Sequence, residues 1–175
     1  MSSICPQSSN VVRGSTLSKK PCCSRLKMTD EDDNRVSRAR TVNQTVIEVT
    51  REFVRRHLEL ASSGGQFDRA YEYARSVYEQ HRLQLDHLIS AMTLTDRQST
   101  TESFGNIVEN VFSSGYNWGR VTIVIVFAGC VTKRCLEQRI ITTEDADGFA
   151  EELGMKLAEQ LLRSDLNLVR MNPIG

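Results

Sequence analysis

The chain has 175 residues, and its 22 Lys and Arg balance 22 Asp and Glu, so the formal net charge is zero. A phosphate-binding surface normally needs excess positive charge, so we exclude nucleic acid as the expected main partner. No run of about 18 apolar residues occurs, and the opening residues lack the apolar core of a signal peptide. These features predict a one-domain intracellular chain without a transmembrane helix.

Residues 1–40 differ in composition from the rest of the chain. They are rich in Ser, Lys, Arg and Asn, contain two of the three prolines and show no apolar periodicity. Such a segment cannot bury enough apolar surface to offset the entropy of ordering it. We therefore expect a disordered N-terminal arm over 1–40 and a helical bundle over 41–175.

The bundle is expected to be all-α, because no proline occurs between Pro21 and Pro173 and apolar residues recur at helical spacing. Ser99-Thr-Thr-Glu102 has the form of a capping box, and Thr143 is a candidate cap for the last helix. The amphipathic segments are 41–60, 67–92, 104–112 and 143–161.

The segment VTIVIVF at 121–127 is rich in β-branched residues, which alone favours a buried strand. A single strand would have no partner here, because every neighbouring segment has helical period. An apolar segment between amphipathic helices suits a buried central helix, which we predict over 118–137.

Enzyme and metal-site signatures are missing from the sequence. It contains no GxSxG, Walker or GxGxxG motif, no CxxC pair and no HExxH, so we expect no enzyme activity, no cofactor and no metal. The five cysteines are expected to be free thiols, and Cys130 and Cys135 to be buried small hydrophobes.

The segment 108–129 carries the most specific pattern. Asn117-Trp118-Gly119-Arg120 follows an amphipathic segment and a glycine turn, and it opens the apolar central segment. This resembles the first homology motif of the Bcl family of apoptosis regulators. Residues 46–58 resemble the fourth motif, whereas Arg75-Ser76 stands where the third has Gly-Asp. The second motif should follow Leu166, and there only Leu168 corresponds to its first Trp.

The resemblance implies a bundle of seven or eight helices around the central helix, with a surface groove that accepts an amphipathic helix from a partner. Gly119 would allow close approach, Arg120 would pair with an Asp of the partner helix, and Asn117 would cap the central helix and bond the partner. Trp118 would pack as scaffold. The implied pocket residues are Ile107, Val111, Ile123 and Phe127.

Ordinary structural roles stand beside these functional ones. Arg120 could be a solvated charge and Gly119 a packing glycine, although the whole motif favours function. For the four pocket residues a core role is about equally favoured, because apolar residues on bundle helices are usually core.

The function that the resemblance implies is an anti-apoptotic regulator that binds the death-motif helices of pro-apoptotic family members. Arg75-Ser76 in place of Gly-Asp would weaken a death motif of the chain's own, which favours the inhibitor. The alternatives are a pore-forming pro-apoptotic effector at the mitochondrial outer membrane and a diverged bundle with another signalling partner. The expected location is the cytoplasm, with association to the mitochondrial outer membrane.

Overall fold

The computed structural model describes residues 30–61 and 65–171, with side chains described for Ser37, 41–61 and 65–163. These residues form helices and no strands, which confirms the all-α class. The elements in chain order are α1 (Asp30–His57), the 3₁₀-helix η1 (Gly65–Phe67), α2 (Asp68–Ala91), α3 (Arg97–Phe112), α4 (Trp118–Glu137) and α5 (Ala146–Met171). The predicted number of seven or eight helices is not confirmed: the described ranges hold five α-helices and one 3₁₀-helix.

Three helices begin elsewhere than predicted. α1 begins at Asp30, so it overlaps the arm predicted over 1–40. Residues 1–29 lie outside the described ranges, and the division of the chain at residue 40 stays a prediction. α3 begins before the predicted capping box, because Asp96 is its N-cap and accepts a hydrogen bond from the Ser99 amide. α5 begins at Ala146, after the predicted Thr143 cap.

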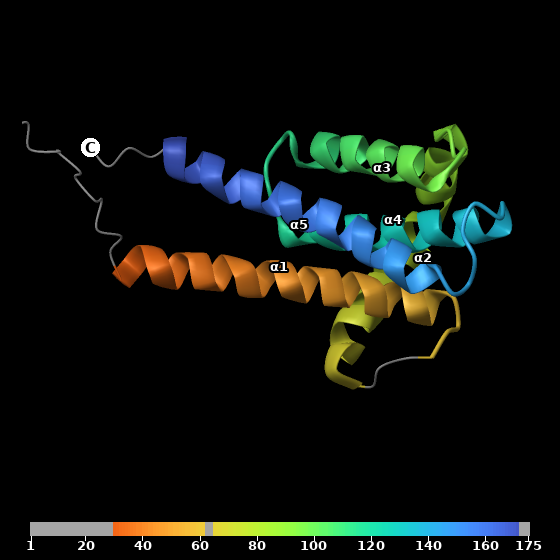
Figure 1. Cartoon of the computed structure of the whole chain (residues 1–175), viewed down its shortest axis with the longest axis horizontal. Helices are drawn as coiled ribbons and strands as arrows, with labels where there is room; N and C mark the ends of the chain where they lie inside the picture. The colour runs from red at the N-terminus through yellow and green to blue at the C-terminus, as the bar shows by residue number, and fades with distance from the viewer. Residues whose placement is uncertain (1–29, 62–64, 172–175) are drawn as a thin grey trace, which may run out of the picture.

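α1, α3, α4 and α5 run roughly along one long direction, and α2 crosses them (Figure 1). α1 and α5 lie side by side and antiparallel, so the start of α1 and the end of α5 are at the same end of the molecule. α4 lies between them and α2, and contacts α1, α2, α3 and α5. This arrangement gives α4 a neighbour on almost every side.

The central position of α4 explains its sequence. Val124, Val126, Phe127 and Val131 on α4 are each no more than 2 % exposed, on different faces of the helix. Fully burying such side chains contributes about 1.5–3 kcal/mol each, which outweighs the small helix-propensity cost of β-branched residues. The predicted central helix over 118–137 is therefore confirmed, with the same bounds.

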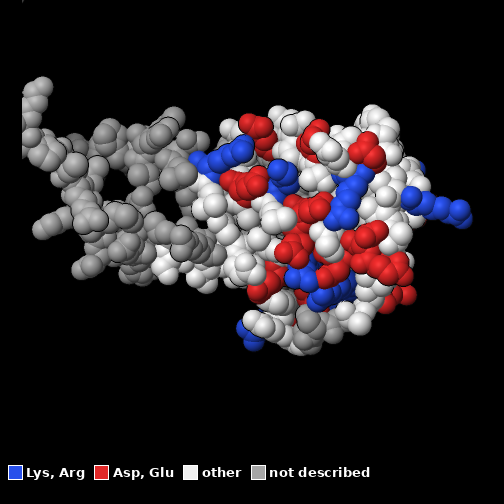
Figure 2. All heavy atoms as spheres, in the orientation of Figure 1, with Lys and Arg blue, Asp and Glu red and all other residues white. Residues whose placement is uncertain are grey.

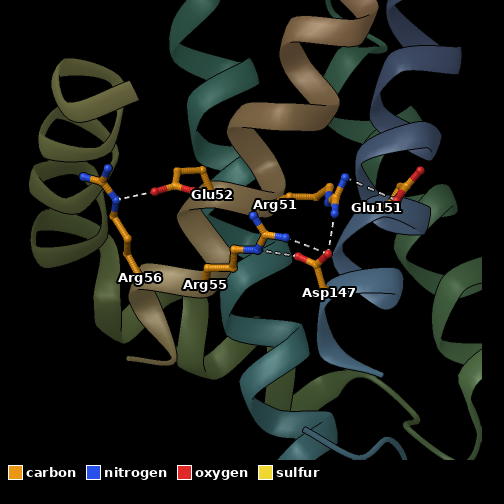
Figure 3. Close-up of polar contacts among 6 residues, drawn as sticks. All are labelled: Arg51, Glu52, Arg55, Arg56, Asp147 and Glu151. Carbon is orange, nitrogen blue, oxygen red and sulfur yellow. Dashed lines mark hydrogen bonds and ion pairs between the residues drawn. The ribbon is translucent and has the colours of Figure 1, made fainter. Parts of the chain in front are cut away.

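A charged cluster joins α1 to the start of α5 (Figure 3). Arg51 and Arg55 of α1 both bond Asp147, and the Arg55 Nε–Asp147 Oδ1 distance is 2.6 Å. Arg51 also lies 3.5 Å from Glu151, one turn further along α5. Burial raises the pKa of Asp147, but the hydrogen bonds from the two arginines outweigh it and hold that pKa below its ordinary value. The cluster fixes the register of α1 against α5.

A second ion pair satisfies a buried carboxylate on α1. Glu52 is only 2 % exposed and accepts a hydrogen bond from Arg56 Nε at 2.6 Å. Arg56 also lies 2.9 Å from Asp68 at the start of α2. The Arg56 side chain therefore links two helices while it compensates a charge that would be costly to bury alone.

Cys130 and Cys135 on α4 are free and buried, as predicted. Burial raises their pKa values, to about 12 for Cys130 and about 11 for Cys135. Because the thiolate is the reactive form, both behave as packed apolar side chains.

The charges that balance in the sequence are also mixed in space. Figure 2 shows acidic and basic side chains interspersed over the face seen in Figure 1, without a large patch of either sign. No helix within the described ranges is long and apolar enough to cross a membrane.

Candidate functional site: a groove between α2 and α4

A groove of about 520 Å³ lies between α2 and the first turns of α4. We call it the α2–α4 groove. Its lining combines apolar, amide and cationic side chains from the two helices. The lining residues are Tyr73, Val77, Gln80, His81, Gln84, Leu85 and Leu88 from α2, with Asn117, Gly119, Arg120 and Ile123 from α4.

The α2 wall follows from helical spacing. Val77, Gln84 and Leu88 are separated by seven and four residues, so they lie on one face of the helix. Leu85 at the base is buried, Val77 is half-buried and Leu88 at the rim is 38 % exposed. The groove therefore offers apolar surface at steps that match the anchors of an amphipathic helix.

The α4 wall is built by the N-terminus of that helix. Asn117 is the N-cap, and its side-chain oxygen accepts a hydrogen bond from the Arg120 amide at 2.8 Å, as predicted. Without such a cap the first amides of a helix lack partners, so Asn117 fixes where α4 begins. The cap fixes the first turn of α4, which places Gly119 and Arg120, two and three residues after Asn117, at the mouth of the groove.

Gly119 and Arg120 leave this mouth open and positive. A Cβ atom on Gly119 would meet only the Asn117 carboxamide oxygen, at 3.2 Å, so the glycine presents bare backbone to the groove. The Arg120 guanidinium donates a hydrogen bond to the Gly115 carbonyl. Among the described residues it forms no ion pair, which leaves its charge available to a carboxylate.

Four of the seven predicted site residues thus lie together: Asn117, Gly119, Arg120 and Ile123. Ile107 and Val111 on α3 are half-buried against the core and do not line the groove. Phe127 needs correction, because its side chain is 2 % exposed and stacks on Phe104 with the ring centroids 5.7 Å apart. It is a core residue, since the position two turns into α4 faces α3 and not the surface.

The comparisons with known proteins bear on this geometry. The family model described as "Apoptosis regulator proteins, Bcl-2 family" matches residues 71–168, more than half of the chain. The chain belongs to the Bcl-2 family. A comparison with curated protein sequences found no significant match. The matched region runs from the first turn of α2 into α5, so it includes every residue of the α2–α4 groove.

Family membership makes the chain an apoptosis regulator. It also points to other members of the Bcl-2 family as partners. Separately, the described residues show no group of side chains that could hold a metal ion. The groove lining combines apolar residues with amides, and the cation Arg120 lies at its mouth.

The sequence missed the whole α2 wall of the groove. Val77, Leu85 and Leu88 belong to the apolar stripe of the amphipathic segment 67–92, for which the sequence predicted a helix but no binding role. Only part of this stripe is buried: Ala74, Leu85 and Ile89 face α4, whereas His81 and Leu88 are exposed. The width of the apolar stripe could have indicated this wall, because the stripe is wider than the surface that one neighbouring helix can cover.

Trp118 also needs correction. The resemblance implied that Trp118 packs as scaffold, but its side chain is 62 % exposed. It lies on the other side of the α4 N-terminus from the groove, where its ring meets only the edge of Tyr116 among the described ring contacts, at 5.9 Å. Trp118 lies beside Val42 of α1 and Tyr73 of α2, and these neighbours leave most of its side chain in contact with water.

Proposed function

We propose that this Bcl-2 family member is an anti-apoptotic regulator that holds the death-motif helix of a pro-apoptotic relative in the α2–α4 groove. The observation that supports the proposal is the placement of Gly119 and Arg120 at the mouth of an apolar groove. An amphipathic helix would bury its anchors against Val77, Leu88 and Ile123. An Asp on that helix would pair with Arg120, and the small residue beside it would lie over Gly119.

The inhibitory direction of the proposal is supported by α2 itself. An effector must release its own death-motif helix, and the corresponding frame here has Arg75-Ser76 in place of Gly-Asp. Arg75 is exposed and pairs with Glu79 one turn on, at 3.2 Å. If the α2 helix of one copy entered the groove of another copy, Arg75 would come close to that copy's Arg120. The two positive charges would repel each other, whereas an Asp in the motif would attract Arg120.

Binding is tested by titrating the whole chain with a fluorescent death-motif peptide. Leu88→Glu places a charge on the rim of the groove and should weaken the peptide roughly tenfold or more, or about 1.4 kcal/mol. Leu83→Glu is the matched control, because Leu83 is on the same helix, 81 % exposed and outside the groove. Equal affinities for the two variants would refute the assigned site.

Inhibitor and effector are distinguished by dye release from vesicles with the lipid composition of the mitochondrial outer membrane. The proposal expects peptide binding without release, and suppression of the release caused by an activated effector of the family. Release by this chain itself, after addition of the peptide, would show that it is an effector.

A further inference from the structure

A second hollow, separate from the groove, lies where α1, α2 and α4 meet. Its volume is about 260 Å³. We call it the Trp118 hollow. Its lining is almost wholly apolar, and none of the described residues around it is charged. The residues that matter here are Val42 and Val49 of α1, Tyr73 of α2, and Trp118, Val121 and Ile125 of α4.

Apolar side chains at the rim of this hollow are exposed to water to an unusual degree. Trp118 is 62 % exposed, Tyr73 57 % and Val42 39 %, although they come from three different helices. Scattered single apolar residues are ordinary on a protein surface, but a contiguous patch that opens into a hollow marks a place where another segment docks. The patch is distinct from the groove, because Trp118 and the Asn117–Gly119–Arg120 surface lie on opposite sides of α4, with only Tyr73 lining both.

The charge of the chain favours its own N-terminal segment as the occupant. Residues 1–29 contain five basic residues and no acidic one. The remaining residues contain 17 Lys and Arg against 22 Asp and Glu, so the two parts carry opposite net charge. Glu48 lies beside the hollow, in a neighbouring depression that shares Thr41 and Thr45 with it.

The number of residues between each apolar residue of 1–29 and the start of α1 determines whether that residue can reach the Trp118 hollow. Val42 lies twelve residues beyond Asp30 on α1, which is about 18 Å along a helix. Leu17 is thirteen residues before Asp30, and an extended chain of that length spans up to roughly 43 Å, enough to turn back to the hollow. Leu26 is only four residues before Asp30 and spans at most roughly 14 Å, which is too short.

We propose that residues 1–29 dock on the body of the same chain and cover the Trp118 hollow with Val11, Val12 and Leu17. The basic residues of the segment face the net negative body, and the apolar residues remove Trp118 and Tyr73 from water. Because the two parts are covalently joined, their effective concentration is of millimolar order, so a modest apolar contact is sufficient to hold them together. The proposal does not depend on the proposed function, since it uses the other side of α4.

The chain has a single tryptophan, so its fluorescence reports on this hollow alone. The experiment measures the emission maximum and acrylamide quenching of Trp118 in three full-length proteins: the wild type, the triple variant Val11→Ser, Val12→Ser, Leu17→Ser, and the control Leu26→Ser. The triple variant should shift the emission to longer wavelength and raise the quenching constant roughly twofold or more, as expected when an apolar patch loses its cover. Leu26→Ser should match the wild type.

Two outcomes would overturn the proposal. One is a Trp118 that is equally accessible in the wild type and the triple variant. The other is protection that persists in the triple variant and depends on protein concentration, which would show that a second copy covers the hollow. Circular dichroism verifies that all three proteins have the same helicity.

Discussion

The ring of Phe53 on α1 lies directly over Gly129 on α4. A Cβ atom added to Gly129 would be 2.6 Å from Phe53 Cε1, well inside van der Waals contact. Phe53 is 2 % exposed and stacks on His57 with ring centroids 5.5 Å apart, so it has little room to move away. The contact between α1 and α4 therefore depends on a residue without a side chain.

Gly129→Ala should destabilise the fold by about 1–3 kcal/mol, the usual cost of overpacking a core. Urea unfolding measures this difference. Gly105→Ala on α3 is the control, because its Cβ would meet only Lys156 Cδ at 3.8 Å and alanine is the better helix former. Phe53→Leu should partly rescue Gly129→Ala, so additive losses in the double variant would show that the two residues do not compete for space.

Asp147→Asn should lower the free energy of unfolding by about 1–3 kcal/mol. This lies between the contribution of an exposed ion pair and that of a buried one. The substitution leaves Arg51 and Arg55 without their shared carboxylate at the α1–α5 contact. Because the pKa of Asp147 is depressed in the folded state, its contribution is present above pH about 4 and is lost as the pH falls further. Glu79→Gln, which removes the exposed pair with Arg75, is the control. Equal losses for the two variants would contradict a structural role for the cluster.

His57 should make stability depend on pH. Burial lowers its pKa from the ordinary 6.5, and the nearby Lys133 lowers it further, while its Nε2 is buried with no hydrogen-bond partner among the described residues. Below pH 6.5 the unfolded chain takes up a proton that the folded chain resists, so stability falls with pH, by at most about 1.4 kcal/mol per pH unit.

His57→Phe should flatten this pH dependence, because phenylalanine can stack on Phe53 and does not titrate. The measurement is urea unfolding between pH 7.5 and 5.5, chosen as about one pH unit on each side of the ordinary histidine pKa. His81→Gln, at an exposed position of α2, should keep the wild-type slope. A slope that survives His57→Phe would mean that another group carries it.

Gly119→Ala should weaken a death-motif peptide by about 1–3 kcal/mol, because its methyl group would stand where the partner helix comes closest. The unfolding free energy should change by less than about 1 kcal/mol, since only the Asn117 cap is crowded. Gly105→Ala again serves as the control, with unchanged affinity. If Gly119→Ala lost stability and kept its affinity, the glycine would be a packing residue and the groove would be misassigned.

Arg120→Ala should cost about 2–5 kcal/mol of peptide binding, because it leaves the peptide's Asp partly desolvated and unpaired. Folding should barely change, since the Arg120 guanidinium bonds only the Gly115 carbonyl among the described contacts, and the hydrogen bond of its backbone amide to Asn117 is kept in the variant. The pairing itself is isolated with a second peptide in which the Asp is replaced by Ala. The two losses should be far from additive; additive losses would show that the two groups do not meet.

The elements of the fold could be predicted because each depends on local pattern. The apolar segment 118–137 is a helix with the predicted bounds, since its neighbours offer no strand to pair with. The predicted first residues of the helices were less accurate. At α3, for example, both Asp96 and Ser99 are suitable N-cap residues, and the structure uses Asp96. The groove residues around Asn117 could be predicted as a group because Asn117, Gly119 and Arg120 fall within four successive positions of the sequence.

The sequence by itself determined the helical class, the central helix and the cluster of Asn117, Gly119 and Arg120, because periodicity and capping act within a few residues. Only the tertiary structure decided which apolar residues are core and which are surface. Phe127 is buried because Phe104 of α3 covers its side of α4, whereas Trp118 is exposed because its neighbours on α1 and α2 leave most of its side chain in contact with water. Burial is a property of the neighbours that the fold supplies, and a residue's own type and spacing do not specify them.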